Sequence, residues 1–453
     1  MSIRSLRSEW GPMLRLAAPV VVAELGWTAM GTVDTLMVGR LSAEAIGAVA
    51  LGTAVFLGIT IFGMGLLLGL DTMISQAHGA GRLDECRRSF LHGVYAACLL
   101  TLPLTAVLQG VVRLLPRLGI HPDVLALTIP YLQPVVYSLL PLLLYSASRR
   151  FLQATGHETA VMVILIAANA INALTNWVLV FGNLGLPRLG VVGAGWATFV
   201  SRVFMALAMI GWVLLHQGKE LRRTSFAPEW VRFRRLFDLG VPAAFQITLE
   251  LGLFAVATGL AGRLDPASLA AHQVAITVAS TTFMVPLGVS SAAAVRVGRA
   301  VGRHDPEAIA RSGWTAILLG VSFMATAMLT LLLVPRHIIG LFTADGDVLS
   351  VGISLLRVAA FFQLFDGLQV VTIGVLRGLG DTRTPMFASL AGYWILGLPV
   401  GYTLTFTLDR GVSGLWVGML VGLASVGAVL LAVWVRRLRK LASSSRPRFG
   451  EST

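Results

Sequence analysis

Apolar stretches of about 20 to 25 residues recur along the whole chain, and this pattern limits the fold more than any other feature. An α-helix rises about 1.5 Å per residue, so about 20 residues cross a hydrocarbon core of about 30 Å. Only 13% of the 453 residues are charged, whereas about a quarter would be charged in a typical soluble domain. We therefore predict an all-α, polytopic membrane protein rather than a soluble protein of two or three domains.

The apolar stretches predict twelve transmembrane helices. The first is too long for the apolar part of a signal peptide and no small-residue cleavage site follows it, so we expect it in the mature protein. The predicted spans cover residues 13–38, 46–74, 89–112, 126–148, 159–182, 190–215, 237–261, 268–292, 312–334, 350–376, 385–407 and 412–435.

Basic residues are distributed unevenly between the two ends of these spans. Most of the 35 Lys and Arg residues lie in the amino terminus, the even-numbered connections and the carboxyl tail. This bias is the positive-inside pattern, and it predicts that both termini are cytoplasmic. The net charge of +13 is explained in this way, so we expect no nucleic-acid partner. The basic connection at residues 216–235 is interpreted as a lipid-facing loop.

The two halves of the chain repeat one plan. Pro19 in LAAP and Pro242 in LGVP are 223 positions apart, and Gly39 and Gly262 in two GRL segments have the same offset. GAGRLDECRRS is matched by VGRHDPEAIARS, and FLQATG by VLRGLG. Six spans per half give both halves one orientation, and such duplicated lobes are typical of transporters. We predict an amino-terminal lobe, an inter-lobe loop, a carboxy-terminal lobe and a disordered cytoplasmic tail, at residues 1–215, 216–235, 236–440 and 441–453.

Four carboxylates lie well inside the predicted spans, where each costs about 2.5–3.5 kcal/mol at the bilayer centre and is a functional candidate by default. Asp34 lies roughly 9 Å below the outer edge of the first span. Glu250 and Asp366 lie near the middle of the seventh and tenth spans, and their shared depth predicts one site. The role of Glu24 is left open between function and structure. Asp71 is expected to be solvated at the cytoplasmic interface.

The fifth span offers polar partners for Asp34. Asn169, Asn172 and Asn176 have the spacing i, i+3 and i+7, which places them on one face of a helix. Thr198 in the sixth span lies at a similar depth. These residues are candidates for a secondary cation site, or they form the hydrogen bonds between helices that hold the lobe together. Carboxylate, amide and hydroxyl oxygens suit Na+, whereas a proton needs only the carboxylate.

Several segments resemble those of the multidrug and toxic compound extrusion (MATE) transporters: GTVDTLMVGRLS, EAIGAVALGTAVF, ELGLFAVATGLAGRL, AAHQVAITVAS and FDGLQVVTIGVLRGLGDTRTP. The resemblance covers nearly the whole chain and is closest to the bacterial NorM branch, in which the first, seventh and tenth helices each have an acid. Asp34, Glu250 and Asp366 stand at the matching positions. Pro19 stands where the family has a proline linked to helix bending, or it is an ordinary kink. Asn176 departs from the DinF branch, which has Asp there.

This resemblance implies a V-shaped pair of six-helix lobes that expels cationic, amphipathic drugs and dyes in exchange for inward Na+ or H+. A deprotonated carboxylate in a low-dielectric cavity attracts any of these cations, so binding of one promotes release of another. We therefore predict a secondary active multidrug efflux transporter, with Na+ or H+ as coupling ion and no cofactor or other metal. It is expected to be a monomer surrounded by lipid in the bacterial inner membrane.

Two other functions are weighed against this prediction. A lipid-linked oligosaccharide flippase would need Arg or Lys well inside its spans to bind pyrophosphate. Only Arg202 and Arg357 lie well inside spans here, and such long side chains can snorkel to the interface. A membrane enzyme is disfavoured because GHETAVM at residues 156–162 lacks the second His of an HExxH motif.

Overall fold

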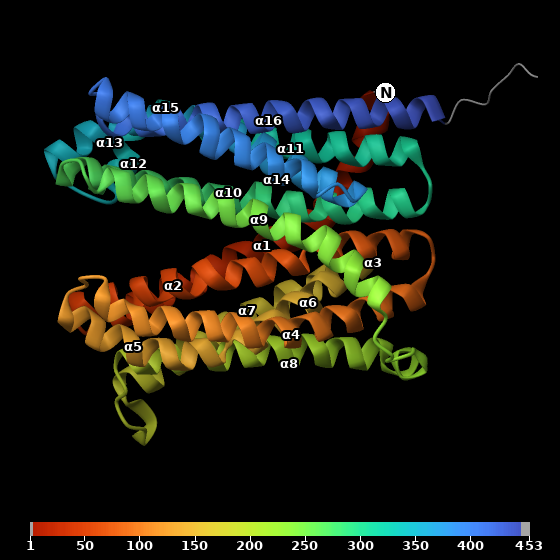
Figure 1. Cartoon of the computed structure of the whole chain (residues 1–453), viewed down its shortest axis with the longest axis horizontal. Helices are drawn as coiled ribbons and strands as arrows, with labels where there is room; N and C mark the ends of the chain where they lie inside the picture. Colours follow the sequence, from red (N-terminus) through yellow and green to blue (C-terminus); the bar gives the residue numbers. More distant parts are fainter. Residues whose placement is uncertain (1–2, 445–453) are drawn as a thin grey trace, which may run out of the picture. The chain divides into compact units, whose positions relative to one another are not determined.

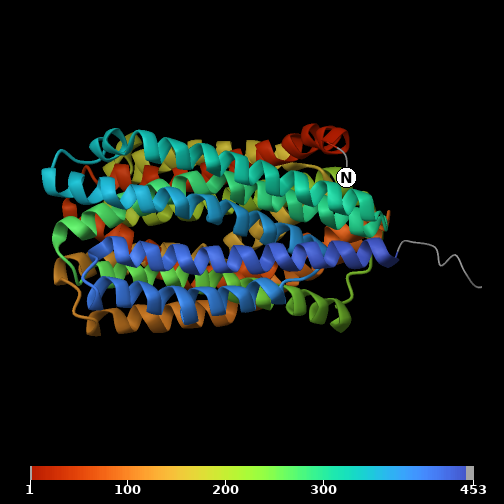
Figure 2. The ribbon, with the colours of Figure 1, turned by 90° about the horizontal axis from the view of Figure 1, so that it is seen from above.

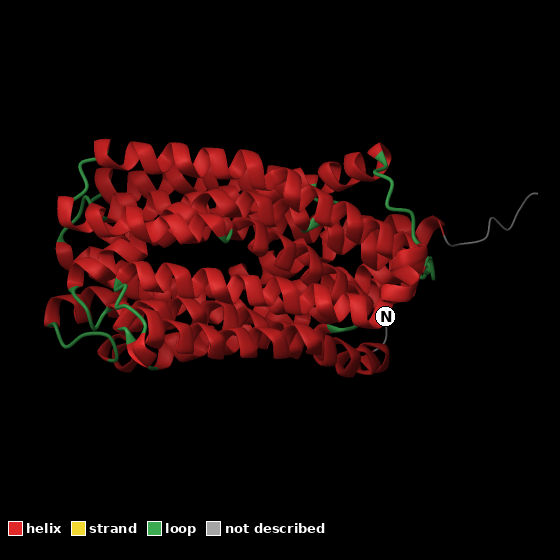
Figure 3. Cartoon of the chain, turned by 90° about the horizontal axis from the view of Figure 1, so that it is seen from below, coloured by secondary structure: helices red, strands yellow, loops and turns green. Residues whose placement is uncertain are grey.

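The computed structural model describes residues 3–444, and helices occupy almost all of them (Figure 3). By length and composition, eleven helical segments of this part of the chain can cross a membrane, and the bent pair α5–α6 makes a twelfth. No strand occurs among residues 3–444. The prediction of an all-α, polytopic membrane protein is therefore confirmed. Most of the predicted tail, residues 445–453, lies outside the described residues.

The described residues cluster into two compact units. Unit 1 is drawn from Met1–Val21, Gly79–Gly81 and Phe245–Thr453, and unit 2 from Val22–His78 and Arg82–Ala244. Helices α1 (Ile3–Val38) and α9 (Trp230–Ala261) therefore each contribute to both units. The V-shaped arrangement and the predicted lobe boundaries stay predictions.

In unit 2, helix α7 packs along α8, α2 packs against α5, and α6 packs against both α4 and α8 (Figure 1). Backbone groups in lipid need internal hydrogen bonds, which continuous helices supply. The helices of this unit, besides the parts of α1 and α9, are α2 (Ala43–Leu67), α3 (Gly69–Gly79), α4 (Leu83–Leu114), α5 (Pro122–Tyr137), α6 (Leu139–Thr155), α7 (Glu158–Phe181) and α8 (Val191–Arg223), with short 3-10 turns η1 (Leu115–Arg117) and η2 (Asn183–Gly185).

In unit 1, the long helix α13 packs against α10, α11 and α16 (Figures 1 and 2). A Cβ on Gly374 of α13 would lie 2.2 Å from the Ser290 carbonyl oxygen of α10, so this close approach requires glycine. The elements are α10 (Pro266–Gly302), α11 (Pro306–Leu333), α12 (Pro335–Gly340), α13 (Gly346–Leu379), α14 (Arg383–Ser389), α15 (Leu398–Tyr402) and α16 (Gly411–Ser444), with π-helical segments η3 (Leu390–Gly397) and η4 (Thr403–Thr407).

The boundaries between the two units lie at equivalent positions of the sequence repeat. Helix α1 passes from unit 1 to unit 2 after Val21, and α9 passes from unit 2 to unit 1 after Ala244. These two points are 223 positions apart, like Pro19 and Pro242, and each lies two residues beyond its proline. The prolines therefore mark equivalent transition points in the two halves.

The predicted fourth span is bent rather than straight. Helices α5 and α6 meet at Ser138 with an angle of 45° between them. Pro134 has no N–H to donate to the preceding turn, and the Ser138 hydroxyl bonds the Val135 carbonyl at 2.5 Å. A proline near a helix end, with a side chain competing for backbone acceptors, explains the bend.

Ion pairs lie near the beginnings of both α1 and α9. In unit 1, Glu9 pairs with Arg296 and Arg311. In unit 2, Arg88 Nη1 lies 3.1 Å from Glu229 Oε1. Arg88 and Arg311 are 223 positions apart, so the same repeat position binds an acid at the start of a span in both halves.

The connection between α8 and α9 is shorter than the predicted loop at 216–235. Helix α8 continues through Arg223 and α9 begins at Trp230. The intervening segment is attached to α4, because the Tyr95 hydroxyl donates to the Phe226 carbonyl at 2.8 Å and the Glu229 N–H donates to His92 Nε2 at 2.8 Å. It is therefore anchored to α4, and its interpretation as a lipid-facing loop stays a prediction.

Candidate functional site

Helix α1 places Asp34 among polar side chains of α7 and α8 in unit 2. Asn172 and Asn176 donate through Nδ2 to Asp34 Oδ1 at 3.1 and 2.7 Å, and Thr198 Oγ1 donates to Oδ2 at 2.9 Å. Asp34 is 6% exposed, and both asparagines are fully buried. The structure thus brings together the acid and all three of its predicted partners, which we call the Asp34 cluster.

The asparagines of the Asp34 cluster retain unused acceptors. Asn172 Oδ1 and Asn176 Oδ1 are buried and have no hydrogen-bond partner among the residues described. Rotating an amide by 180° exchanges its nitrogen and oxygen, so these side chains can offer either donors or oxygens. Hard cations prefer oxygen ligands. The cluster can therefore satisfy a bare carboxylate, or present carboxylate, amide and hydroxyl oxygens to a monovalent cation.

Asn169, one turn before Asn172, has a different role. Its Nδ2 donates to the Gly26 carbonyl of α1 at 3.0 Å and to the Leu165 carbonyl of its own helix at 2.9 Å. This side chain joins α7 to α1, as the structural interpretation of the asparagine stripe predicts. Asn172 and Asn176 therefore belong to the Asp34 cluster, whereas Asn169 joins two helices.

A second acidic group lies in unit 1. Gln246 Nε2 donates to Glu250 Oε2 at 2.8 Å from one turn earlier in α9. Asp366 in α13 is 4% exposed, and its charge interacts with that of Glu250, so the structure brings these two predicted acids together as the Asp366 pair. Tyr393 of η3 also interacts with both charges and donates its hydroxyl to Gln369 Oε1.

The surroundings of Asp366 leave its charge uncompensated. Within residues 3–444, no side chain or backbone group donates a hydrogen bond to its carboxylate, and no Lys or Arg pairs with it. Burying a carboxylate without donors or a counter-charge is strongly unfavourable. A proton or another cation is therefore needed to stabilise this group.

Two further acids form buried ion pairs in unit 2. Glu24 pairs with Arg149, and Asp71 Oδ2 lies 3.5 Å from Arg150 Nη1. Asp71 is 1% exposed, so the prediction that it is solvated at the interface was wrong. The reason is that α6 continues to Thr155, which keeps both arginines inside the unit although the predicted span ended at residue 148.

Arg202 lies within unit 2 and does not snorkel. It is 9% exposed, its guanidinium carbon is 4.5 Å from the centroid of the Phe56 ring, and Nη1 donates to Ser138 Oγ at 2.6 Å. Its side chain is therefore fixed in the protein by an aromatic face and a hydroxyl. Arg357, by contrast, is exposed.

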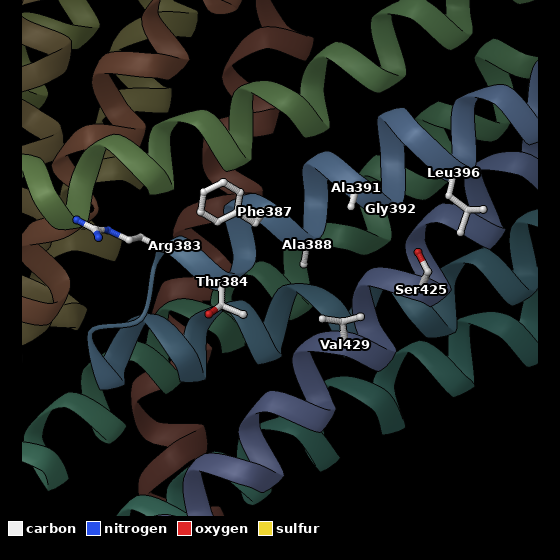
Figure 4. Close-up of a pocket in the computed structure, with 9 residues that line it drawn as sticks. All are labelled: Arg383, Thr384, Phe387, Ala388, Ala391, Gly392, Leu396, Ser425 and Val429. Carbon is white, nitrogen blue, oxygen red and sulfur yellow. The ribbon is translucent and has the colours of Figure 1, made fainter.

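A groove of about 630 Å³ in unit 1 is separate from these acids (Figure 4). It lies between α14, η3 and α16, and its lining is almost entirely small or apolar apart from Arg383, Thr384 and Ser425. Neither Glu250 nor Asp366 belongs to this lining. The nine lining residues are Arg383, Thr384, Phe387, Ala388, Ala391, Gly392, Leu396, Ser425 and Val429.

Sequence reasoning missed several partners of these acids. Gln246 could have been found, because it lies four positions before Glu250 and so on the same helix face. Arg149 and Arg150 follow the predicted span at 126–148, so their burial had no signal in the sequence. Tyr393 gave no signal, because its proximity to the acids depends on how η3 packs.

A duplicated set of long apolar helices, with buried acids in each unit, defines a polytopic membrane protein. The MatE family model matches residues 19–178 and 242–403, once in each half. The chain belongs to the MatE family.

Similar proteins belong to the NorM branch, which the resemblance of the sequence motifs also indicates. The chain is 40% identical to a probable multidrug resistance protein NorM of Mesorhizobium japonicum, over 96% of this chain and 95% of that protein. It is 34% identical to a multidrug resistance protein NorM of Photobacterium profundum, over 96% of both. The predicted family and its NorM-like branch are confirmed.

Solved structures share the fold. The eukaryotic MATE transporter AtDTX14 superposes with a TM-score of 0.86 at 21% identity, over 97% of this chain and 99% of that one. A MOP superfamily transporter from Pyrococcus furiosus gives a TM-score of 0.87 at 19% identity, over 95% and 96% of the two chains.

Proposed function

We propose that this protein is a secondary active multidrug efflux transporter, which exports cationic amphipathic compounds in exchange for inward Na+ or H+. The observation that most supports this proposal is the Asp366 pair, in which Asp366 is buried and no Lys or Arg of the described residues compensates its charge. The Asp34 cluster supplies a second acid with oxygen ligands in the other unit. The NorM relatives are named for multidrug resistance.

The exchange follows from competition for these carboxylates. A proton, Na+ or a cationic drug stabilises the same buried negative charge, so two of them exclude each other at one acid. Binding of the inward-moving cation then favours release of the drug. This mechanism needs no chemical step and no cofactor.

The two separate acidic groups favour a stoichiometry above one cation per drug. A one-for-one exchange of monovalent cations moves no net charge, whereas two cations per drug gain about 2.3 kcal/mol per 100 mV of membrane potential. Exchange without current in reconstituted vesicles, at every imposed potential, would rule out this part of the proposal.

The proposed setting is the bacterial inner membrane, with both termini cytoplasmic and the protein acting as a monomer. The distribution of Lys and Arg supports that orientation. The two halves at 1–215 and 236–440 are proposed to be the lobes that move during transport, joined at 216–235.

A lipid-linked oligosaccharide flippase remains the alternative outcome. It would need cationic side chains available to pyrophosphate. Two of the buried arginines, Arg149 and Arg150, are instead paired with Glu24 and Asp71. This pairing favours a cationic substrate over an anionic one.

Ethidium efflux from energised cells that lack their main pumps tests the proposal. Wild type, Glu250→Gln and Asp366→Asn are compared after separate Na+ and acid pulses, at matched amounts of protein in the membrane. Efflux that one ion stimulates in wild type, and that both variants lose, is the expected result. Absence of efflux from correctly inserted wild type would favour the flippase.

A further inference from the structure

Arg202 is a buried cation that the proposed exchange does not yet use. Its Nη1 bonds Ser138 and its guanidinium lies over Phe56. Its Nε is buried and has no hydrogen-bond partner in the part of the chain that the structure describes. A buried guanidinium needs a nearby negative charge to offset its desolvation.

Asp34 supplies a negative charge that acts on Arg202. Arg202 follows Thr198 by one turn of α8, so both side chains lie on one helix face. Thr198 bonds Asp34 directly, and the Arg202 charge interacts with Asp34 and with the Tyr131 hydroxyl. No ion pair within 4.0 Å joins Arg202 to Asp34. Ser138 and Phe56 therefore hold the guanidinium beside the Asp34 cluster rather than on its carboxylate.

We propose that Arg202 is a fixed countercharge that sets the affinity of the Asp34 cluster for the coupling cation. This inference rests on the proposed function. A proton or Na+ at Asp34 is repelled by the guanidinium, which weakens its binding. When the cation leaves, Arg202 still compensates the carboxylate, so the unoccupied cluster is not left with an isolated buried charge.

Among the residues described, Arg202 is the only cation whose charge acts on Asp34, and the other groups around Asp34 are neutral. Helix α7 contributes the neutral amides of Asn172 and Asn176, and α8 contributes the Thr198 hydroxyl. Helix α5 contributes Tyr131, whose hydroxyl lies 3.3 Å from Thr53 Oγ1. Arg202 therefore acts as a positioning and affinity-determining residue, and it does not need to contact the cation.

The test measures transport by purified full-length protein in liposomes as a function of cation concentration. Ethidium movement is followed in NaCl series, with choline chloride holding ionic strength constant, and separately in a pH series without Na+. Arg202→Gln is expected to lower the half-saturating concentration of Na+ or of protons about tenfold. Arg202→Lys keeps the charge and is expected to stay within about threefold of wild type.

A second variant keeps the test independent of whether Arg202→Gln folds. Ser138→Asp places a carboxylate at the hydroxyl that Arg202 bonds, which neutralises the guanidinium without deleting it. It is expected to shift the half-saturating concentration in the same direction as Arg202→Gln. Ser138→Ala removes the hydrogen bond but keeps the charge of Arg202, so a smaller shift than that of Ser138→Asp is expected.

The outcomes separate this inference from the proposed function. A purely structural role for Arg202 would lower the amount of folded protein and leave the half-saturating concentration unchanged in both charge-altering variants, which would overturn the inference alone. A wild-type protein that responds to neither Na+ nor protons would overturn the proposed function, and the inference with it.

Discussion

At the residue scale, Asp34 is held by three hydrogen-bond donors rather than by a direct ion pair. These donors are the side chains of Asn172, Asn176 and Thr198. Asp34→Asn replaces its carboxylate with an amide of nearly equal volume. We expect cation-stimulated ethidium efflux to fall at least tenfold while folded protein is retained, because the charge is lost and the shape is kept.

Asn169→Ala is the matched control for this change. Asn169 lies on the same stripe of α7 but bonds only backbone carbonyls. Its loss should destabilise the protein by about 1 kcal/mol and leave the response to cations intact. Retention of the cation response in Asp34→Asn, or its loss in Asn169→Ala, would contradict the assignment of roles along the stripe.

The Glu24–Arg149 pair makes a different prediction, about stability. Both residues are at most 7% exposed, so removing one side chain leaves an unpaired buried charge. Glu24→Gln and Arg149→Met should each lower the free energy of unfolding by about 3–5 kcal/mol. The double variant should lose clearly less than the sum, as measured by chemical denaturation in detergent. Additive losses would show that the two charges do not stabilise each other.

At the scale of elements, α1 and α9 each have a proline just before the point where the helix passes between the units. Pro19→Ala and Pro242→Ala would each restore a backbone N–H donor and so stiffen the helix at equivalent positions. We expect both variants to transport ethidium several-fold more slowly with no loss of thermal stability. Pro12→Ala, within α1 but inside unit 1, is the control and should resemble wild type. If only Pro19→Ala slowed transport, the two halves would not be equivalent hinges.

The ion pair at the start of α9 predicts a dependence of stability on pH. Partial burial acts to raise the pKa of the Glu229 carboxyl, but the hydrogen bonds and charges of Arg232 and Arg88 outweigh this effect and lower the pKa from its usual 4.5. A lowered pKa in the folded state means that the carboxylate stabilises the protein above about pH 4.5 and loses this effect as the pH falls through the folded value.

Glu229→Gln should therefore melt at most a few degrees below wild type at neutral pH, because the pair is partly exposed. The difference should shrink towards zero as the pH is lowered to about 3. Thermal melts of both proteins across this range provide the measurement. A difference that stayed constant over the range would mean that the amide disturbs packing rather than charge.

At the scale of the whole molecule, helix number and duplication could be predicted from the sequence because apolar length and repeated motifs are local properties. The Asp34 cluster was also accessible, since helical spacing alone aligns Asn172 with Asn176. The bend at Ser138 and the burial of Arg149, Arg150 and Arg202 could not be predicted. They depend on which helix continues past a charged residue and which neighbour covers it, and these are consequences of packing.

The same limit explains the error at Asp71. A carboxylate near the predicted end of a span is inexpensive if water reaches it, and only the continuation of α6 shows that Arg150 reaches it instead. The position of an acid within a predicted span therefore predicts its exposure to water less well than the residues that pack against it.

Buried carboxylates are proposed to exchange an inward cation for an outward drug. The most direct test uses purified protein in liposomes loaded with ethidium, with an imposed Na+ or proton gradient as the only energy source. Wild type should move ethidium against its gradient when one of the two cations flows the opposite way, and Asp366→Asn should not. Movement that proceeds equally without either gradient, or that survives in Asp366→Asn, would contradict the account.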